Sequence, residues 1–426
     1  MLFWLIETKQ QLKKYFNRGY KEAFVEIIPY NYHSHPSENK ISLLYIRPLD
    51  AKKGFIFPIS HSESIPLDIE DISEITNSLD TIYVRDKKEY LHFILNKNVI
   101  DITLKNQYIP KLTNAHYFLS NKFPNKYDIN RIIPVTKHYE YCENMFNDIK
   151  NNIELEYNKF YNNKVSLVFN AIERNGIKIN TQEFEKHFYK PDSDIIHTQY
   201  NFKTTTSRPS NHFHKVNFAA LNKEDGCRRA FIPKNDKYIE FDITAYHPTI
   251  LSNMIGYTFK NPDIHGEFAK MYKTDYQKSK KITFQMIYGG IFKQYKDLEF
   301  FKLTQQYIDK LWNEFNTKGF VECEISKFRF YKEKLEDMNP SKLLNYIIQQ
   351  KETVYNTLIL WNIIKLLRNK NTQLVLTCYD SFLFDFDENE EETLDDIRNV
   401  FRLKNLQIKE KTGYNYHDMY NKSIES

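Results

Sequence analysis

Short apolar runs of strand length alternate with helical spacing in the first part of the chain. The runs at 24–28, 41–46 and 54–59 are rich in β-branched and aromatic residues, as strands are, and residues 86–95 have the spacing of a helix. This alternation predicts a self-contained α/β domain over residues 1–135.

The pattern then turns helical over residues 137–200, where Met145, Ile149, Ile153 and Leu155 recur with a ragged period near 3.6. This segment predicts a helical arm between the first domain and a strand-rich region. Further along, the pattern predicts helices over 305–315 and 345–367, a strand over 319–325, and a last helix whose first turn is the acidic run 390–396.

Two aspartates interrupt apolar strand-like runs that lie far apart in the sequence. Asp242 ends the run that starts at Tyr238 and turns at once into a predicted helix, and Asp380 interrupts the hairpin-like run 374–385. Buried carboxylates with no basic neighbour are costly unless a cation neutralises them. Because Mg²⁺ prefers hard oxygen ligands and substrate phosphates, the pair indicates phosphoryl chemistry.

A helix predicted between the two aspartates carries Lys280, Phe284 and Tyr288 four residues apart, on one face. A cation and two aromatic rings on one face suit a triphosphate and a base. The alternative is a core-facing amphipathic helix, which spacing alone favours. The position between the aspartates, and the glycine pair that ends the helix, favour the binding role.

Three other segments carry groups of the kinds that can bind nucleic acid. Arg208 follows a hydroxyl-rich turn and Arg228 precedes an apolar run, and hydroxyls beside arginines are common phosphodiester ligands. Asn345 and Gln349 share a helix face, from which two amides can contact groove edges. Each segment alone is more often an ordinary turn or a surface helix.

Composition changes this picture little. The 426 residues predict about three domains, and the net charge of +5 permits a polyanionic partner without requiring one. No apolar run approaches the ~20 residues of a membrane span, and the short run at the N-terminus lacks the features of a signal peptide. The expected location is cytoplasmic, in the host cytoplasm if the source is viral. The four scattered cysteines predict neither a zinc site nor disulfides.

Taken in order, these segments resemble the motifs of family A DNA polymerases, the class of bacterial DNA polymerase I. The resemblance covers roughly the last two-thirds of the chain, and seven motifs occur in register between Lys203 and Phe384: Thr204–Arg208, Arg228–Phe231, Asp242–Thr249, Lys280 to Gly289, Gly319–Cys323, Asn345 with Gln349, and Tyr379–Ser381. The abundant Asn, Lys, Ile and Tyr further suggest an AT-rich viral or mobile-element source.

The resemblance implies an α/β (α+β) right-hand polymerase fold. A 3′–5′ exonuclease-like domain of the ribonuclease-H type would occupy residues 1–135, a thumb-like helical region 136–203, and palm and fingers 204–426, with the fingers at about 255–310. The implied reaction is addition of dNTPs to a primer on template DNA. Helicase, primase or processivity partners are further candidates, and no membrane partner is expected.

The resemblance also implies roles for single residues. Asp242 and Asp380, with the backbone carbonyl of Ile243, would hold two Mg²⁺ ions, for which Mn²⁺ can substitute. The remaining site residues divide into those that bind the nucleotide, Lys280, Phe284, Tyr288, His247, Tyr246 and Arg228, and those that bind primer or template, Arg208, Asn345, Gln349 and Tyr379.

Several positions depart from the family pattern. The family's sugar-selecting glutamate is His247 here, so the hypothesis is that its imidazole, or the ring of Tyr246, excludes a 2′-hydroxyl. A helix arginine is replaced by Tyr276, for which Lys278 or Lys281 are candidate substitutes. Tyr379 and Ser381 flank Asp380 in place of histidine and glutamate, a variant also found in single-subunit RNA polymerases, and Tyr246 begins a segment similar to one in family B polymerases.

The first domain lacks the paired carboxylates of an active exonuclease. Glu26 stands alone on its run, Leu91 occupies an expected aspartate position, and only Glu143 is a conservative replacement. A degenerate, structural domain without proofreading is therefore predicted. His33, His35 and His61 are expected to be solvated loop histidines. Two alternatives stay open: a single-subunit RNA polymerase or an enzyme with relaxed sugar selectivity, and an inactive nucleic-acid-binding scaffold.

Overall fold

The structure is a computed structural model that describes residues 4–16, 19–31, 33–105, 133–153, 156–214 and 216–421. The chain divides into two compact units, residues 1–170 and 171–426. The boundary falls inside helix α7 (Ser166–Asn175). The three-part division of the chain at residues 135 and 203 stays a prediction.

Unit 1 contains a six-stranded sheet in the order β1-β4-β3-β2-β5-β6. β2 pairs antiparallel with β3, and β3 with β4, whereas β5 and β6 run parallel to β2. The strands are β1 (Trp4–Leu5), β2 (Glu22–Pro29), β3 (Ile41–Pro48), β4 (Phe55–Pro58), β5 (Thr81–Val84) and β6 (Val99–Asp101). The helices are α1 (Lys9–Tyr15), α2 (Ile69–Asn77), α3 (Lys87–Phe93) and α6 (Val135–Ile153), followed by a π-helical turn at Tyr161–Val165 and by α7.

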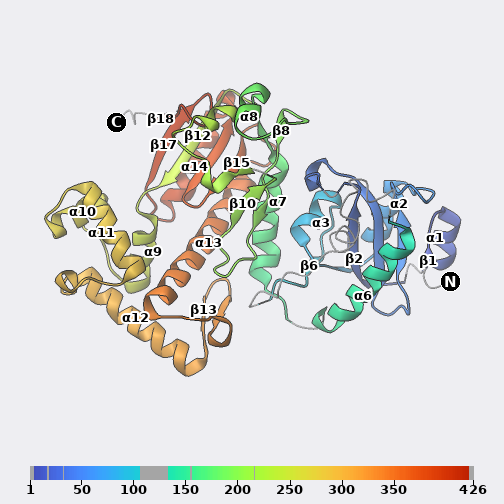
Figure 1. Cartoon of the computed structure of the whole chain (residues 1–426), viewed down its shortest axis with the longest axis horizontal. Helices are drawn as coiled ribbons and strands as arrows, with labels where there is room; N and C mark the ends of the chain where they lie inside the picture. Colours follow the sequence, from blue (N-terminus) through green and yellow to red (C-terminus); the bar gives the residue numbers. More distant parts are fainter. Residues whose placement is uncertain are drawn as a thin grey trace. The chain divides into compact units, whose positions relative to one another are not determined.

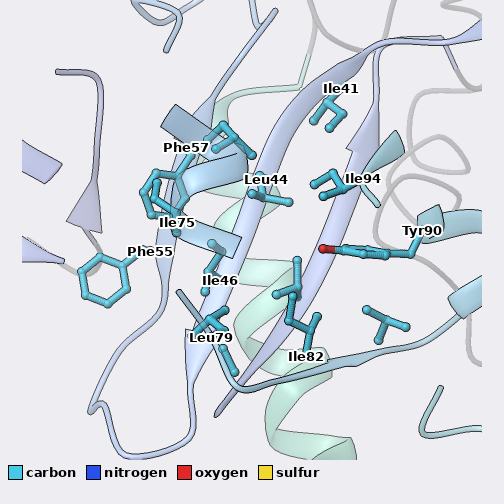
Figure 2. Close-up of a cluster of buried hydrophobic side chains, with 14 of the residues drawn as sticks. Ile41, Leu44, Ile46, Phe55, Phe57, Ile75, Leu79, Ile82, Tyr90 and Ile94 are labelled. Atoms are coloured by element: carbon cyan, nitrogen blue, oxygen red, sulfur yellow. The ribbon is translucent and has the colours of Figure 1, made fainter. Parts of the chain in front are cut away.

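Both faces of this sheet are buried, which explains why its strands read as continuous apolar runs. Alternate residues of β3 point to opposite faces. Leu44 and Ile46 pack with residues of α1, α2 and α3, as Figure 2 shows for Ile75, Tyr90 and their neighbours. Leu43 and Tyr45 pack on the other side with residues of α6. The predicted strands and the helix over 86–95 are confirmed as β2, β3, β4 and α3.

The prediction for two of the three loop histidines is wrong. His33 is exposed, but His35 and His61 are almost fully buried. His35 Nδ1 accepts a hydrogen bond from the Ser37 amide, and His61 bonds to the Ile133 carbonyl and the Glu63 amide. Their turns fold inward because the ring nitrogens bond to backbone groups that would otherwise be unpaired.

Unit 2 is built around a five-stranded antiparallel sheet in the order β15-β16-β12-β17-β18. Its strands are β12 (Lys237–Ile243), β15 (Gln373–Cys378), β16 (Ser381–Phe386), β17 (Ile408–Gly413) and β18 (Tyr420–Asn421). Smaller strands are β7 (Ile177–Lys178), β8 (Ile195–Ile196), β9 (Tyr200–Asn201), β10 (Ser210–Phe213), β11 (Val216–Asn217), β13 (Phe320–Glu322) and β14 (Arg329–Tyr331). The helices are α8 (Thr181–His187), α9 (Tyr246–Ile255), α10 (Ile264–Tyr272), α11 (Tyr276–Gly289), α12 (Glu299–Lys318), α13 (Pro340–Leu366) and α14 (Glu391–Arg402).

Apolar side chains cover the two faces of the five-stranded sheet. Phe401 of α14 packs on Phe241 and Phe382, with ring centroids 5.7 and 5.3 Å apart, and Tyr238 and Leu383 belong to the opposite core. α10 and α11 lie side by side at a distance from this sheet (Figure 1). Because both of its faces are packed, the five-stranded sheet is a rigid base from which strand ends can present side chains.

The helices predicted in this unit are confirmed as α12, α13 and α14, each longer than or offset from its predicted range. The strand predicted over 319–325 is only β13, which pairs with β14. It ends early because the chain turns at Cys323, whose amide donates to the Phe328 carbonyl. Gly319, at φ +77°, ends α12 in the left-handed conformation that glycine tolerates best. None of the described helices is both long and apolar enough to cross a membrane.

Candidate active site

Asp242 and Asp380 are brought together by the pairing of β12 with β16. Asp242 lies opposite Ser381 in the antiparallel register, so the residue before Ser381 lies beside the end of β12. Asp380 belongs to the two-residue turn between β15 and β16, where Tyr379 has φ +59°. The Ile243 amide donates to the Asp380 carbonyl at 2.8 Å and ties the turn to β12. Both side chains line one pocket of about 200 Å³.

The electrostatics of the pair favour a bound cation. Burial raises the pKa of Asp242 above its ordinary value, although the nearby Lys411 opposes this shift. Burial, and then the negative charge of Asp242, raise the pKa of Asp380. The expectation that neither aspartate has a basic neighbour is wrong for Asp242, because Lys411 Nζ lies 3.9 Å from its Oδ2 atom. That ammonium lies nearer Glu240, at 3.0 Å, so it leaves negative charge in the pocket.

The pocket lies between the sheet and the open face of α11. Tyr276, Lys280, Phe284 and Tyr288 of this helix line it, whereas the residues that α11 buries are Ser279, Thr283, Met286 and Ile287. The rings of Phe284 and Tyr288 are stacked, with centroids 5.7 Å apart and planes 14° apart. The core-facing alternative for the Lys280 face is therefore wrong, because the core takes a different face of the helix.

Buried Glu352 of α13 joins the two sides of the pocket. Its Oε2 atom lies 3.1 Å from His247 Nε2 and 2.8 Å from Arg208 Nε. The Tyr288 hydroxyl lies 2.5 Å from His247 Nδ1, and burial raises the pKa of this phenol to about 12, which keeps it protonated at neutral pH. The guanidinium of Arg208 also lies over the ring of Tyr379, 3.6 Å from its centroid. This network holds the imidazole of His247 by both nitrogens.

Sequence reasoning did not single out Glu352, His265 or Lys409, which also line the pocket. Glu352 follows Gln349 by three residues on the same helix face, and this spacing is the signal that identifies it. His265 on α10 is almost fully buried, and its ring lies against Tyr276 with centroids 5.7 Å apart. Lys409 comes from β17, and the sequence gives no local signal for it.

The other predicted residues are divided between the pocket and its surroundings. Tyr246 lines the pocket, and its hydroxyl donates to Asn356 at 2.8 Å. Gln349 lies outside the pocket lining, accepting from Thr206 at 3.0 Å and donating to Asn345 at 3.1 Å. The Thr204–Arg208 turn is thereby connected to α13.

Arg228 also lies outside the residues that line the pocket. Its guanidinium donates to the Leu221 carbonyl at 2.8 Å and lies 4.6 Å from the centroid of the Tyr416 ring. These contacts give Arg228 a structural role in unit 2. Its predicted contact with nucleotide needs a movement away from Leu221.

Comparison with known proteins finds similarity in structure alone. No family model matches the sequence. No curated protein matches it either. Among solved structures, the POL domain of Pol1 from M. smegmatis, in complex with a DNA primer-template and dNTP, is similar with a TM-score of 0.67 and 12% sequence identity. The alignment covers 96% of this chain and 98% of that one. The chain thus has a mixed α/β fold that resembles a DNA polymerase domain.

Proposed function

We propose that this protein is a template-directed DNA polymerase of the family A type, which adds dNTPs to the 3′ end of a primer. One observation carries the proposal: Asp242 and Asp380 share a pocket with the Lys280, Phe284 and Tyr288 face of α11. The fold resembles a polymerase domain whose solved complex contains primer-template and dNTP. An inactive scaffold gains nothing from two adjacent carboxylates whose charge is incompletely balanced.

The carboxylates suit a pair of Mg²⁺ ions, with Mn²⁺ as a substitute. Asp242 and Asp380 offer hard oxygen ligands, and burial, which is the first cause of their raised pKa values, also strengthens their attraction to a cation. They would hold the metals together with the Ile243 carbonyl. When bound, such ions activate the attacking hydroxyl and neutralise charge that develops on the phosphates.

The remaining pocket residues are suited to orient the substrates. Lys280 is exposed on the open face of α11 and has no hydrogen bond or ion pair among the described contacts, so its ammonium can bind the triphosphate. The stacked rings of Phe284 and Tyr288 offer flat surfaces to a base pair. Arg208, held by Glu352 and Tyr379, would contact the primer end.

A primer-extension assay tests this function. The protein is incubated with Mg²⁺ and a labelled primer on a template, with dNTPs and rNTPs in separate reactions. Extension by dNTPs that follows the template sequence is expected. Synthesis from rNTPs without a primer would instead favour the RNA polymerase alternative, and a failure to extend while DNA is still bound would favour the scaffold.

Sugar selection is the proposed role of His247. Its imidazole ring is held by Tyr288 and Glu352, so the ring cannot easily move aside and would clash with a 2′-hydroxyl. Forcing extra atoms against a fixed wall costs about 1–3 kcal/mol. His247→Ala is therefore expected to lower the preference for dNTPs over rNTPs about 10- to 100-fold.

Competing single-nucleotide incorporation measures this preference, with Tyr246→Phe as the matched control. The control keeps the neighbouring ring and removes only its hydroxyl, so its preference is expected to stay near that of the wild type. A wild-type protein that incorporates rNTPs as readily as dNTPs contradicts the hypothesis for both residues.

Unit 1 is proposed to be a degenerate exonuclease-like domain of the ribonuclease-H type. Its strand order β4-β3-β2-β5-β6, with three antiparallel strands followed by two parallel ones, supports this relationship. Arg85, directly after β5, makes a buried ion pair with Glu26 of β2 at 2.8 Å, so a protein cation already neutralises this carboxylate. Glu143 accepts hydrogen bonds from Tyr45 at 2.7 Å and Arg47 at 3.0 Å. Both carboxylates are held by structural partners.

The wild-type protein is accordingly expected to leave a mismatched primer end intact in the presence of Mg²⁺ or Mn²⁺. The measurement is the length of a labelled, mismatched primer over time without dNTPs. Metal-dependent shortening that disappears in Glu26→Ala or Glu143→Ala would show that the domain is an active nuclease.

A further inference from the structure

Lys409 lies directly across from Asp242 in the pairing of β12 with β17. Side chains of directly opposed residues in an antiparallel pair project to the same side of the sheet. Lys409 is exposed and lines the same pocket as Asp242 and Lys280. The sheet thus supplies a cation at the base of the pocket, whereas Lys280 belongs to the helix on the other side.

The ammonium group of Lys409 is uncommitted, unlike that of its neighbour on the same strand. Lys411 forms an ion pair with Glu240 at 3.0 Å. Lys409 Nζ makes no hydrogen bond or ion pair with any residue that the structure describes. Two lysines two residues apart on one strand therefore have different roles: Lys411 is bound to a carboxylate of the sheet, and Lys409 remains available to a ligand.

His265 provides a second observation at this end of the pocket. Its side chain is 3% exposed, and its Nδ1 atom has no hydrogen-bond partner among the described residues. Burial, and then the positive charges of Lys280 and Lys409, lower the pKa of His265 to about 4, although the carboxylate of Asp263 opposes this shift. Both ammonium groups are therefore near one imidazole, from opposite walls of the pocket. Two ammonium groups and a buried ring nitrogen without a hydrogen-bond partner in one place are suited to bind an anion.

The α11 helix offers no other cation at this position. Tyr276, one turn before Lys280, occupies the place where the family resemblance implies an arginine, and it lines the pocket. The suggested substitutes Lys278 and Lys281 are exposed and are not among the residues that line it. The second cation at this end of the pocket is therefore Lys409, which belongs to β17 and not to α11.

We propose that Lys409 binds the β- and γ-phosphates of the incoming dNTP, opposite Lys280, and replaces the cation absent at Tyr276. This inference rests on the proposed polymerase function. A strand residue in register with Asp242 is held at a fixed distance from the metal-binding pair, so it can reach phosphates that lie next to that pair. The competing role is purely electrostatic, in which Lys409 only balances the charge of Asp242.

Binding of the triphosphate group distinguishes these two roles. Lys409→Met is expected to raise the KM for dNTPs, and to weaken the binding of inorganic tripolyphosphate measured by calorimetry, about 10- to 100-fold. Affinity for the primer-template should change little. Lys409→Arg should keep most of the affinity, and Lys404→Met, at an exposed lysine before β17, should behave like the wild type. A change in the Mg²⁺ requirement with unaltered tripolyphosphate binding would overturn the proposal.

A compensating substitution gives a second test. Tyr276→Arg restores a cation on α11, so in a Lys409→Met background it is expected to recover most of the lost dNTP affinity. In the wild-type background it should add little. The inference is wrong if the double variant binds dNTPs as weakly as Lys409→Met alone and if Lys409→Met binds tripolyphosphate as tightly as the wild type does. The polymerase function still stands in that case, provided that the wild type extends primers. If the wild type extends no primer, the proposed function itself fails.

Discussion

Alanine at Asp242 or Asp380 is expected to reduce the rate of primer extension at least about 10³-fold. Each carboxylate would be a ligand of the catalytic metals, whose stabilisation of the transition state is worth several kcal/mol, and each 1.36 kcal/mol changes the rate tenfold. Because the two aspartates act on one cluster, the double variant should be little slower than either single variant.

Single-turnover extension by each variant measures this effect, with Asp309→Ala as the control. Asp309 is an exposed carboxylate on α12 whose partner is Gln305, far along the chain from the pocket residues. The control is expected to extend primers at the wild-type rate. Activity within tenfold of the wild type in either pocket variant would remove the basis of the two-metal proposal.

The same pair predicts a dependence on pH. The pKa values of Asp242 and Asp380 are raised, so both hold protons at a higher pH than ordinary aspartates. Protons then compete with the metals, and extension at limiting Mg²⁺ should fall as the pH drops toward these pKa values. Without metal, a raised pKa means that ionisation costs stability above the unfolded pKa. In EDTA at neutral pH, Asp242→Asn should therefore unfold at a higher temperature than the wild type, which also shows that the variant folds.

The sequence identifies residues whose position follows from local structure. Asp242 follows an apolar run, and Asp380 stands between two runs that can only form a hairpin, so both were predictable as strand-end carboxylates. The face that carries Lys280 and Phe284 was predictable from helical spacing, and the structure confirms that this face is open. Spacing alone cannot distinguish an open face from a buried one, because apolar aromatic residues suit both.

Residues that reach the pocket only through the order of the strands in the sheet could not be predicted from local sequence patterns. Lys409 and Lys411 lie more than 160 positions after Asp242, and they approach it only because β17 is inserted beside β12 on the edge opposite β16. Charged residues such as these lysines are common on strands near the edge of a sheet, so their spacing gives no sign of a binding role. The role of Arg228 near the nucleotide or template stays a prediction, and its guanidinium bonds to the Leu221 carbonyl and lies on the ring of Tyr416 in this structure.

Glu352 changes how the departures from the family pattern are understood. The position that carries a glutamate in the family is His247 here, and Glu352 brings a buried carboxylate to that imidazole from α13. The same carboxylate is paired with Arg208, so the residue proposed to select the sugar and the residue proposed to contact the primer share one negative charge. Removing Glu352 would leave the half-buried guanidinium of Arg208 without this ion pair and the imidazole of His247 without its Nε2 partner.

Replacing Lys280 by alanine is expected to reduce kcat/KM for dNTPs about 10²- to 10³-fold. A lysine that contacts the transferring phosphates stabilises charge that develops in the transition state, and loss of one such preorganised group typically has this effect. Lys280 is exposed, lines the pocket and is not among the residues that α11 buries. The thermal unfolding temperature should therefore stay close to that of the wild type.

The adjacent Lys281 provides a matched control for this substitution. Lys281 is also exposed on the same helix and has the same charge, but it is not among the residues that line the pocket. Lys281→Ala should leave kcat/KM within about threefold of the wild type, since an exposed charge outside a site contributes little. Steady-state incorporation of a single dNTP measures both variants. Equal losses at Lys280 and Lys281 would mean that the helix attracts the nucleotide only through its overall charge, and that the spacing of Lys280 with Phe284 and Tyr288 carries no specific function.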